Sequence, residues 1–182
     1  MWIDQLPQCA PTVHPYTMQQ VVRVESGGDP LALHVNGLAA NRQPKPSSTA
    51  EAVAAARMFI ATGFSVDLGL VQINSRNLPS LHLTIQQVLG TDPATMCANL
   101  AGGARILTSN YVSATLRFEP GQPALKAALS AYNTGTFDKG FANGYVARYF
   151  SVPSVVVPTA TPTAPRIISV AVNHRASDTE AW

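Results

Sequence analysis

The residue in this chain best suited to chemistry is Glu25, which lies at the end of an apolar helix face. In a helix over residues 16–25, this carboxylate follows Met18, Val21 and Val22 at the i, i+3, i+4, i+7 spacing of one face. Burial with that face is expected to raise its pKa, and the negative end of the helix dipole acts in the same direction. A carboxylic acid that stays protonated near neutral pH suits general-acid catalysis. The alternative is that Glu25 is an exposed residue of the last helical turn.

Three short polar segments interrupt the otherwise apolar chain, each at the predicted end of a helix or strand. They are residues 25–28 (Glu-Ser-Gly-Gly), 69–74 (Gly-Leu-Val-Gln-Ile-Asn) and 131–135 (Ala-Tyr-Asn-Thr-Gly). At such ends, polar side chains can converge on a cleft without being buried unpaired. One acid with amides, hydroxyls and a phenol suits a neutral ligand rich in hydroxyl and amide groups, such as an N-acetylated sugar chain. Phosphate fits poorly, because no Gly-rich loop carries a lysine.

Cleavage of a glycosidic bond usually requires two carboxylates, so the other acidic residues of the domain bear on the mechanism. They are Asp4, Asp29, Glu51, Asp67, Asp92, Glu119 and Asp138. Most of them fit caps, turns or exposed loops, and Glu51 completes a capping box that begins at Ser48. Asp67 is the one candidate for a second acid, but it also fits a turn anchor, since its strand parity opposes that of Gln72 and Asn74. The inventory favours a mechanism with one carboxylate.

Composition and charge argue against several other functions. The net charge is +2, only 12% of residues are charged, and no basic run occurs, so no nucleic-acid partner is predicted. No segment reaches the ~20 apolar residues of a membrane helix, so membrane insertion is not predicted. Residues 1–7 lack the basic and apolar parts of a signal peptide. The four histidines show no metal-ligand spacing, so no metal is predicted; they are His14, His34, His82 and His174.

Periodicity and terminus signals predict a mainly helical domain over residues 1–150. The predicted helices cover about residues 15–26, 48–62, 84–89, 92–111, 122–132 and 143–150. Apolar residues alternate over residues 64–70, which predicts one short strand whose parity Gln72 and Asn74 continue. The Gly102-Gly103 pair in a predicted helix indicates close backbone packing. Residues 151–182 are rich in Pro, Thr and Ala, which predicts a linker and a flexible, disordered tail.

Taken in order, three segments resemble motifs of the soluble lytic transglycosylase family of lysozyme-like enzymes. They are Glu-Ser-Gly-Gly-Asp-Pro from residue 25, Asp-Leu-Gly-Leu-Val-Gln-Ile-Asn from residue 67 and Ala-Leu-Ser-Ala-Tyr-Asn-Thr-Gly from residue 128. The likeness is closest to the branch associated with type IV secretion and conjugation systems, which Asn36-Gly37 and the run at residues 140–146 also resemble. The resemblance covers about residues 8–150 and does not include the tail.

This resemblance implies a lysozyme-like α+β domain with a small strand region. It also implies cleavage of the β-1,4 bond between N-acetylmuramic acid and N-acetylglucosamine with formation of a 1,6-anhydro end. Glu25 corresponds to the single catalytic acid and base, and no cofactor or metal is implied. The implied substrate-binding residues are Ser26, Gln72, Asn74, Tyr132, Asn133 and Tyr145, with Tyr132 matching the tyrosine beside the catalytic glutamate.

A peptidoglycan substrate implies export to the periplasm, with a signal peptide that this sequence does not include. From the residues alone, Cys9 and Cys97 fit either one disulfide or two buried thiols, and the implied export favours the disulfide. The implied partners are glycan strands and, through the tail, subunits of a secretion or conjugation apparatus. Two alternatives stay open: a hydrolytic muramidase on the same fold, and a non-catalytic glycan-binding scaffold module.

Overall fold

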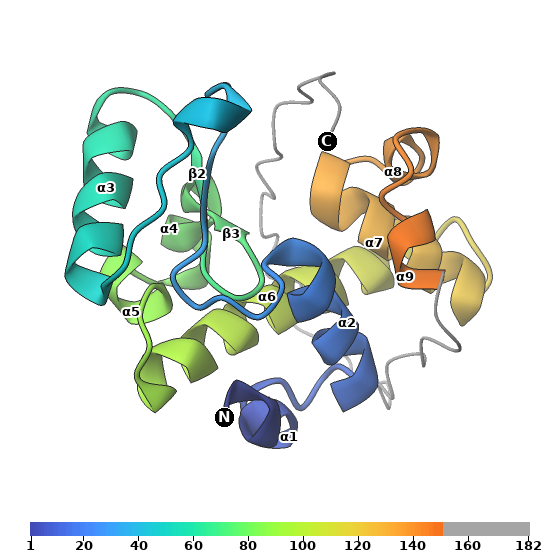
Figure 1. The fold of residues 1–182 in the computed structure, drawn as a ribbon. Helices are drawn as coiled ribbons and strands as arrows, with labels where there is room; N and C mark the ends of the chain where they lie inside the picture. The colour runs from blue at the N-terminus through green and yellow to red at the C-terminus, as the bar shows by residue number, and fades with distance from the viewer. Residues whose placement is uncertain (151–182) are drawn as a thin grey trace.

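The computed structural model describes residues 1–150, a mostly helical α+β domain with one small sheet (Figure 1). The predicted linker and tail, residues 151–182, lie outside the described residues. The fold class predicted from the sequence is therefore confirmed for the domain. In chain order, the elements are η1 (Trp2–Gln5), α1 (Leu6–Cys9), α2 (Pro15–Glu25), β1 (Leu33–Val35), η2 (Ala40–Arg42), α3 (Thr49–Ala61), β2 (Val66–Leu68), β3 (Ile73–Asn74), η3 (Ser75–Asn77), α4 (Leu78–Leu81), α5 (Ile85–Val88), α6 (Pro93–Ala114), α7 (Gln122–Thr134), α8 (Lys139–Ala142) and α9 (Ala147–Phe150).

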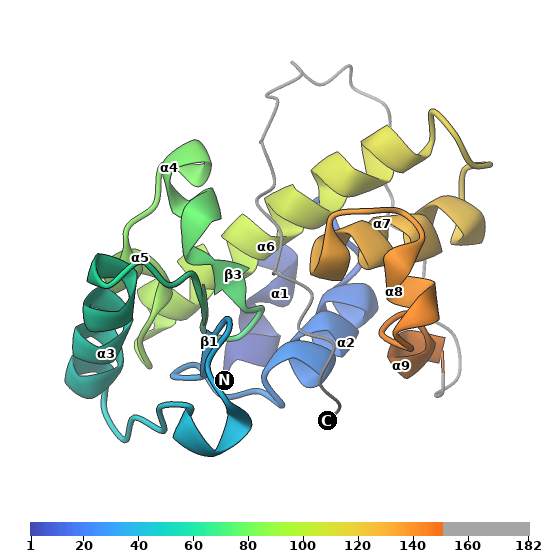
Figure 2. The same ribbon diagram turned by 90° about the horizontal axis from the view of Figure 1, so that it is seen from above.

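Helix α6 runs through the domain between two groups of elements (Figures 1 and 2). The sheet, α3, α4 and α5 lie on one side of the domain, and α7, α8 and α9 lie on the other. Fully buried Leu100 and Leu107 anchor α6 in the core that the two groups share. The arrangement brings the end of α2, the sheet and the end of α7 toward one another, and these are the three segments that carry the polar clusters.

The helix boundaries follow the capping signals of the sequence. Helix α2 begins at Pro15, where a proline costs no hydrogen bond, and it ends at Glu25. Helix α3 begins after Ser48, whose hydroxyl accepts a hydrogen bond from the Glu51 backbone N–H. The Glu51 carboxylate accepts from the backbone and hydroxyl of Ser47, and these bonds lower its pKa. Ser48 is thus the predicted cap, but the predicted capping box is only half formed, because the Glu51 carboxylate bonds to Ser47 and not to the Ser48 N–H.

The Gly102-Gly103 pair of α6 allows the sheet region to pack directly against the helix backbone. A Cβ added at Gly102 would lie 2.6 Å from the Cδ1 atom of Ile73. A Cβ at Gly103 would overlap the Val71 side chain and lie 3.0 Å from the Tyr132 hydroxyl. The predicted close approach is confirmed, and it places the hairpin between β2 and β3 against α6.

Two local predictions were wrong. The segment after Phe64 is not one strand, because the chain turns between β2 and β3 and the two strands pair antiparallel. Strand β1, which was not predicted, pairs with β2 in the same sheet. The predicted helix over residues 143–150 is shorter than expected, since only Ala147–Phe150 (α9) is helical there and the turn before it contains Gly144, with a φ of +75°. Glycine adopts this left-handed conformation without steric cost, and a residue in this conformation cannot continue a right-handed helix.

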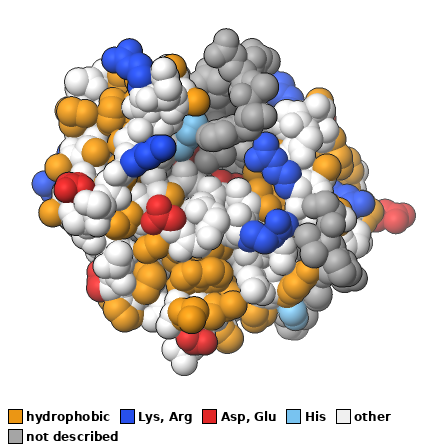
Figure 3. Space-filling view, in the orientation of Figure 1, with side chains coloured by type: hydrophobic (Ala, Val, Ile, Leu, Met, Phe, Trp, Pro, Cys, Tyr) orange, Lys and Arg blue, Asp and Glu red, His pale blue; other side chains and the backbone are white. Residues whose placement is uncertain are grey.

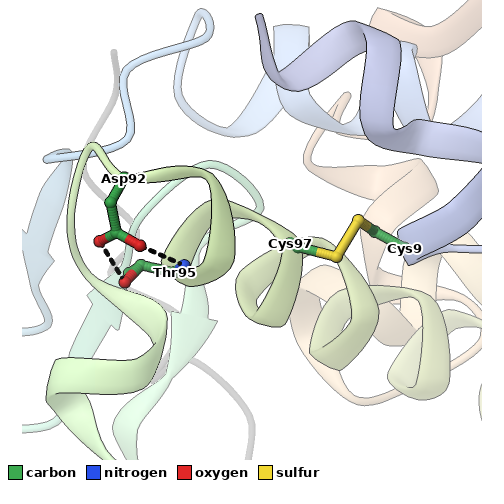
Figure 4. Close-up of a disulfide and its surroundings, with 4 residues drawn as sticks. All are labelled: Cys9, Asp92, Thr95 and Cys97. Atoms are coloured by element: carbon green, nitrogen blue, oxygen red, sulfur yellow. Dashed lines mark hydrogen bonds between the residues drawn. A yellow bond between two sulfur atoms is a disulfide. The ribbon is translucent and has the colours of Figure 1, made fainter.

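A disulfide joins Cys9 at the end of α1 to Cys97 in the first turns of α6 (Figure 4). It closes a loop with a sequence separation of 88 and a Cα–Cα distance of 5.1 Å. The nearby start of α6 is capped by Asp92, whose carboxylate accepts a hydrogen bond from the Thr95 backbone N–H (Figure 4). Of the two alternatives left by the sequence, the structure contains the disulfide. Within residues 1–150, none of the helices has the length and apolar character needed to cross a membrane.

Candidate active site

The three polar segments meet at a small cavity of about 20 Å³ between α2, the hairpin, α6 and α7. Its lining consists of one acid from α2, polar side chains from the sheet region, an aliphatic side chain from α6 and a phenol from α7. The lining residues are Glu25, Asp67, Gln72, Asn74, Asn77, Ile106 and Tyr132. A polar space of this size holds about one water molecule or one polar atom of a ligand. The cavity is thus a polar contact point beside Glu25.

Glu25 is half-buried, intermediate between the inward and the exposed positions that the sequence left open. Its carboxylate accepts a hydrogen bond from the hydroxyl of Tyr145, which lies in the turn before α9. The Tyr145 side chain is buried, and burial together with the nearby Glu25 raises the pKa of this phenol well above 10. Tyr145 therefore stays protonated and serves as a donor to Glu25.

Gln72 lies in the hairpin turn with a φ of +50°, a conformation that few residues other than glycine adopt. Its side-chain amide N–H₂ donates to the backbone oxygens of Gly69 at 2.9 Å and Ala32 at 3.1 Å. These two bonds use both amide protons, so the side-chain carbonyl oxygen remains as the acceptor. The turn thereby holds Gln72 at the cavity in one orientation.

Asp67 faces the same cavity as Glu25, which corrects the parity argument from the sequence. Because β2 and β3 are separate antiparallel strands, Asp67 pairs directly with Asn74 and shares its face of the sheet. The Asp67 side chain is 1% exposed, and its two oxygens accept from Asn74 Nδ2 at 2.8 Å and Asn36 Nδ2 at 3.1 Å. His34 lies opposite Asp67 on β1. A second carboxylate is therefore present at the site.

The remaining predicted site residues hold the site together in different ways. The Ser26 hydroxyl donates to the Leu70 carbonyl oxygen at 2.7 Å and so ties the end of α2 to the hairpin turn. The Tyr132 hydroxyl donates to the Val71 carbonyl oxygen at 2.8 Å, which ties α7 to the same turn. Asn133 is half-buried and accepts a hydrogen bond from Asn143, outside the residues that line the cavity. Ser26 and Tyr132 thus position the turn that carries Gln72.

Asn99, on α6, is the main supporting residue that the sequence analysis missed. Its side chain is 1% exposed and makes three hydrogen bonds, with the Val71 N–H at 3.0 Å and with the carbonyl oxygens of Leu68 and Val88 at 2.8 and 2.9 Å. The signal that could have identified it is an asparagine within the apolar stripe of the predicted helix at residues 92–111. Such a side chain, once buried, requires polar partners from the backbone packed against it.

Replacing Asn99 with alanine is expected to lower the free energy of unfolding by about 2–4 kcal/mol, because three buried backbone groups lose their partners. Urea denaturation followed by circular dichroism measures the loss. Asn143, which is exposed and bonded to Asn133, offers a control, and Asn143→Ala is expected to change stability by less than about 1 kcal/mol. Equal effects of the two substitutions would contradict the structural role of Asn99.

Charged groups on the face that Figure 1 presents are dispersed. Lys and Arg side chains form separate groups with uncharged surface between them (Figure 3). In residues 1–150, no group of three His, Cys, Asp or Glu side chains is placed to hold a metal ion. The polar side chains at the site are two carboxylates, several amides and two phenols.

The domain is mostly helical with one small sheet, and its half-buried glutamate faces a cavity lined with polar groups. These features place it in the lysozyme-like class. Within that class, residues 5–149 match the model of the transglycosylase SLT domain, so the chain belongs to this family. No solved structure was found that matches the chain.

Similar proteins include the protein virB1 of Agrobacterium fabrum, which is 38% identical over 85% of this chain and 60% of the relative's own length. The type IV secretion system protein virB1 of Brucella abortus is 39% identical over 92% of this chain and 74% of the relative. The corresponding protein of Brucella suis is 43% identical over 74% of this chain and 54% of the relative. The chain thus spans between about half and three quarters of the length of these relatives.

Proposed function

We propose that this protein is a peptidoglycan lytic transglycosylase that cleaves the bond between N-acetylmuramic acid and N-acetylglucosamine. The observation that carries the proposal is the placement of Glu25, half-buried at the end of α2, bonded to Tyr145 and facing a cavity lined with amides. Membership of the transglycosylase SLT domain family supports the same activity. A neutral, hydroxyl-rich and amide-bearing glycan matches the hydrogen-bonding groups of the site.

In the proposed reaction, Glu25 first donates its proton to the glycosidic oxygen, and the bond between this oxygen and C1 of the muramoyl sugar breaks. The C6 hydroxyl oxygen of the same sugar then bonds to C1, and its proton returns to Glu25. At C1 one C–O bond is broken and one is formed, the proton of the C6 hydroxyl replaces the one given to the leaving oxygen, and Glu25 recovers its initial protonation state without consuming water. Tyr145 holds the carboxylate in place during both proton transfers.

The polar residues around Glu25 are proposed to bind the glycan in two ways. Gln72 presents its free carbonyl oxygen, and Asn133 offers its amide at the end of α7. Ser26, Asn74 and Tyr132 contribute mainly by holding the turn and the sheet that form the site, because their polar groups bond to other parts of the protein.

The relatives named for type IV secretion suggest where this activity is used. We propose that the protein acts in the periplasm and opens the cell wall locally, so that a secretion or conjugation apparatus can assemble. The catalytic domain is proposed to comprise residues 1–150. The segment 151–182 is proposed as a linker and tail that contacts subunits of the apparatus.

Asp67 gives a specific reason to consider a hydrolytic muramidase as a second candidate. It lines the same cavity as Glu25, and glycoside hydrolases usually use a pair of carboxylates. Its oxygens are occupied by the amides of Asn36 and Asn74, which favours a supporting role. Mass spectrometry of digested sacculi separates the two reactions. Products with 1,6-anhydro ends would support the transglycosylase, and products heavier by one water would support the hydrolase.

The Asp67→Asn variant tests the same question from the protein side. The variant is expected to lose activity by on the order of tenfold, because asparagine keeps only one acceptor oxygen and one of the two amides loses its partner, while its products keep 1,6-anhydro ends. Rates of sacculus clearance and product masses measure both outcomes. The matched control is Asp138→Asn, which changes an exposed carboxylate at the start of α8. A loss as severe as that of Glu25→Gln would favour the two-carboxylate mechanism.

A further inference from the structure

The hydroxyl of Tyr145 has a second neighbour besides Glu25. The hydroxyl oxygen of Tyr149, on α9, lies 2.6 Å from that of Tyr145, and the two rings pack edge to face with centroids 5.3 Å apart. The Tyr149 side chain is fully buried, at 0% exposure. Two phenols and one carboxylate therefore form a continuous hydrogen-bonded series from α9 through the preceding turn to the end of α2.

Counting protons fixes the direction of this series when Glu25 is ionised. A tyrosine hydroxyl has one proton, and that of Tyr145 is donated to the Glu25 carboxylate. The short contact between the two hydroxyls then needs the proton of Tyr149, so Tyr149 is the donor and Tyr145 the acceptor. The bond donated by Tyr149 strengthens the bond from Tyr145 to Glu25, because a hydroxyl that accepts a hydrogen bond becomes a stronger donor.

Other titratable groups lie near Glu25 on the elements packed around it. The titratable groups near it are Asp67 on β2, with His34 opposite Asp67, and Tyr132 on α7, whose hydroxyl donates to Val71. Helix α6 faces the cavity through Ile106, and α1 has no titratable side chain apart from the disulfide-bonded Cys9. On α2 itself, the Arg23 guanidinium donates to Gln20 and to the backbone oxygen of Arg148.

We propose that Tyr149 is a positioning residue that fixes the hydroxyl of Tyr145 toward Glu25 and thereby sets the proton affinity of the catalytic carboxylate. The inference rests on the proposed function of Glu25. Hydrogen bonds donated to a carboxylate favour its ionised form. Removing the outer hydroxyl weakens the inner bond, so Glu25 holds its proton to a higher pH and is less well oriented.

A double-mutant cycle tests the series through activity. Tyr149→Phe is expected to slow sacculus cleavage by on the order of tenfold and to shift the pH–rate profile to higher pH. Tyr145→Phe is expected to be slower still. Because Tyr149 acts through Tyr145, adding Tyr149→Phe to Tyr145→Phe is expected to cause no further loss. Additive losses, or an unchanged pH profile in Tyr149→Phe, would overturn the proposal.

A titration of Glu25 by carbon-13 NMR tests the same series without requiring activity. The chain has four glutamates, and the Glu25→Gln variant identifies the Glu25 carboxyl signal. Tyr149→Phe is expected to raise the midpoint of this titration by about half a pH unit. The matched control is Tyr111→Phe, which removes a hydroxyl that accepts a hydrogen bond from the Gly121 N–H, and it is expected to leave the midpoint unchanged.

These measurements separate the two possible failures. If wild-type protein does not cleave sacculi but the midpoint rises in Tyr149→Phe alone, the positioning role stands and the proposed function is lost. If wild-type protein cleaves sacculi and the midpoint stays constant, the positioning role is lost. Thermal unfolding of each variant shows whether its fold is intact. A shift of the Glu25 titration midpoint that also appears in Tyr111→Phe would count against the proposal.

Discussion

Replacing Glu25 with glutamine is expected to lower the rate of peptidoglycan cleavage by on the order of 10³-fold or more, with almost no change in folding. Glutamine has the same shape, and its carbonyl oxygen can still accept the hydrogen bond from Tyr145. The amide has no proton to transfer at neutral pH and cannot receive one from the sugar hydroxyl. Both proton transfers of the proposed reaction are therefore lost. Clearance of purified sacculi, with mass spectrometry of the released products, measures the change.

An exposed glutamate offers the matched control for this experiment. Glu119 lies in the loop between α6 and α7, and Glu119→Gln is expected to cleave at the wild-type rate. Urea denaturation of both variants shows whether the fold is intact. If Glu25→Gln cleared sacculi as fast as wild type, the acid assignment would be lost. The non-catalytic glycan-binding module would then become the better explanation of the site.

Removing the disulfide by the double substitution Cys9→Ala/Cys97→Ala is expected to lower the free energy of unfolding by about 4–5 kcal/mol. The bridge joins residues 88 positions apart and so restricts the unfolded chain strongly, since the cost of closing a loop rises with its length. The folded state changes little, because α1 stays packed against α6 through its apolar side chains. Urea denaturation of the double variant and of wild type, under oxidising conditions, measures the difference.

A second link between the same two segments provides a control for the disulfide. The hydroxyls of Thr12 and Thr108 form an exposed hydrogen bond of 3.0 Å between the N-terminal segment and α6. Thr108→Val breaks this link without affecting the covalent bridge and is expected to cost less than about 1 kcal/mol. Adding a reductant to wild-type protein should reproduce the loss seen in the double alanine variant. A loss below about 1 kcal/mol after reduction would show that the bridge contributes little.

The helices of this domain could be predicted because their boundaries are marked locally. Pro15, Ser48 and Asp92 each begin a helix for reasons contained in a few neighbouring residues, and the structure confirms all three. The glycines of α6 also gave the right packing prediction. By contrast, β1 contains only three residues, which is too short to show a period.

The site was predicted less completely than the fold, because its geometry depends on a turn. Gln72 adopts a left-handed conformation, so the alternation of Phe64 to Leu70 does not continue to Asn74. This reversal places Asp67 at the cavity, although the strand parity alone pointed it away from the amides. Asn99 acts through the backbone of Leu68, Val71 and Val88, which lie 31, 28 and 11 positions away, and a single sequence gives no register for such contacts.

The bond between Tyr145 and Glu25 joins two residues that are 120 positions apart, and this distance sets an order of events during synthesis. The acid is made early, whereas its phenol partner is added near the end of the described chain. At about 5–20 residues per second, a ribosome needs roughly 6–24 s to make the intervening segment. A chain that stops before residue 145 contains the acid without the group that orients it. Under the proposed mechanism, competence for catalysis is acquired only after nearly the whole domain has been made.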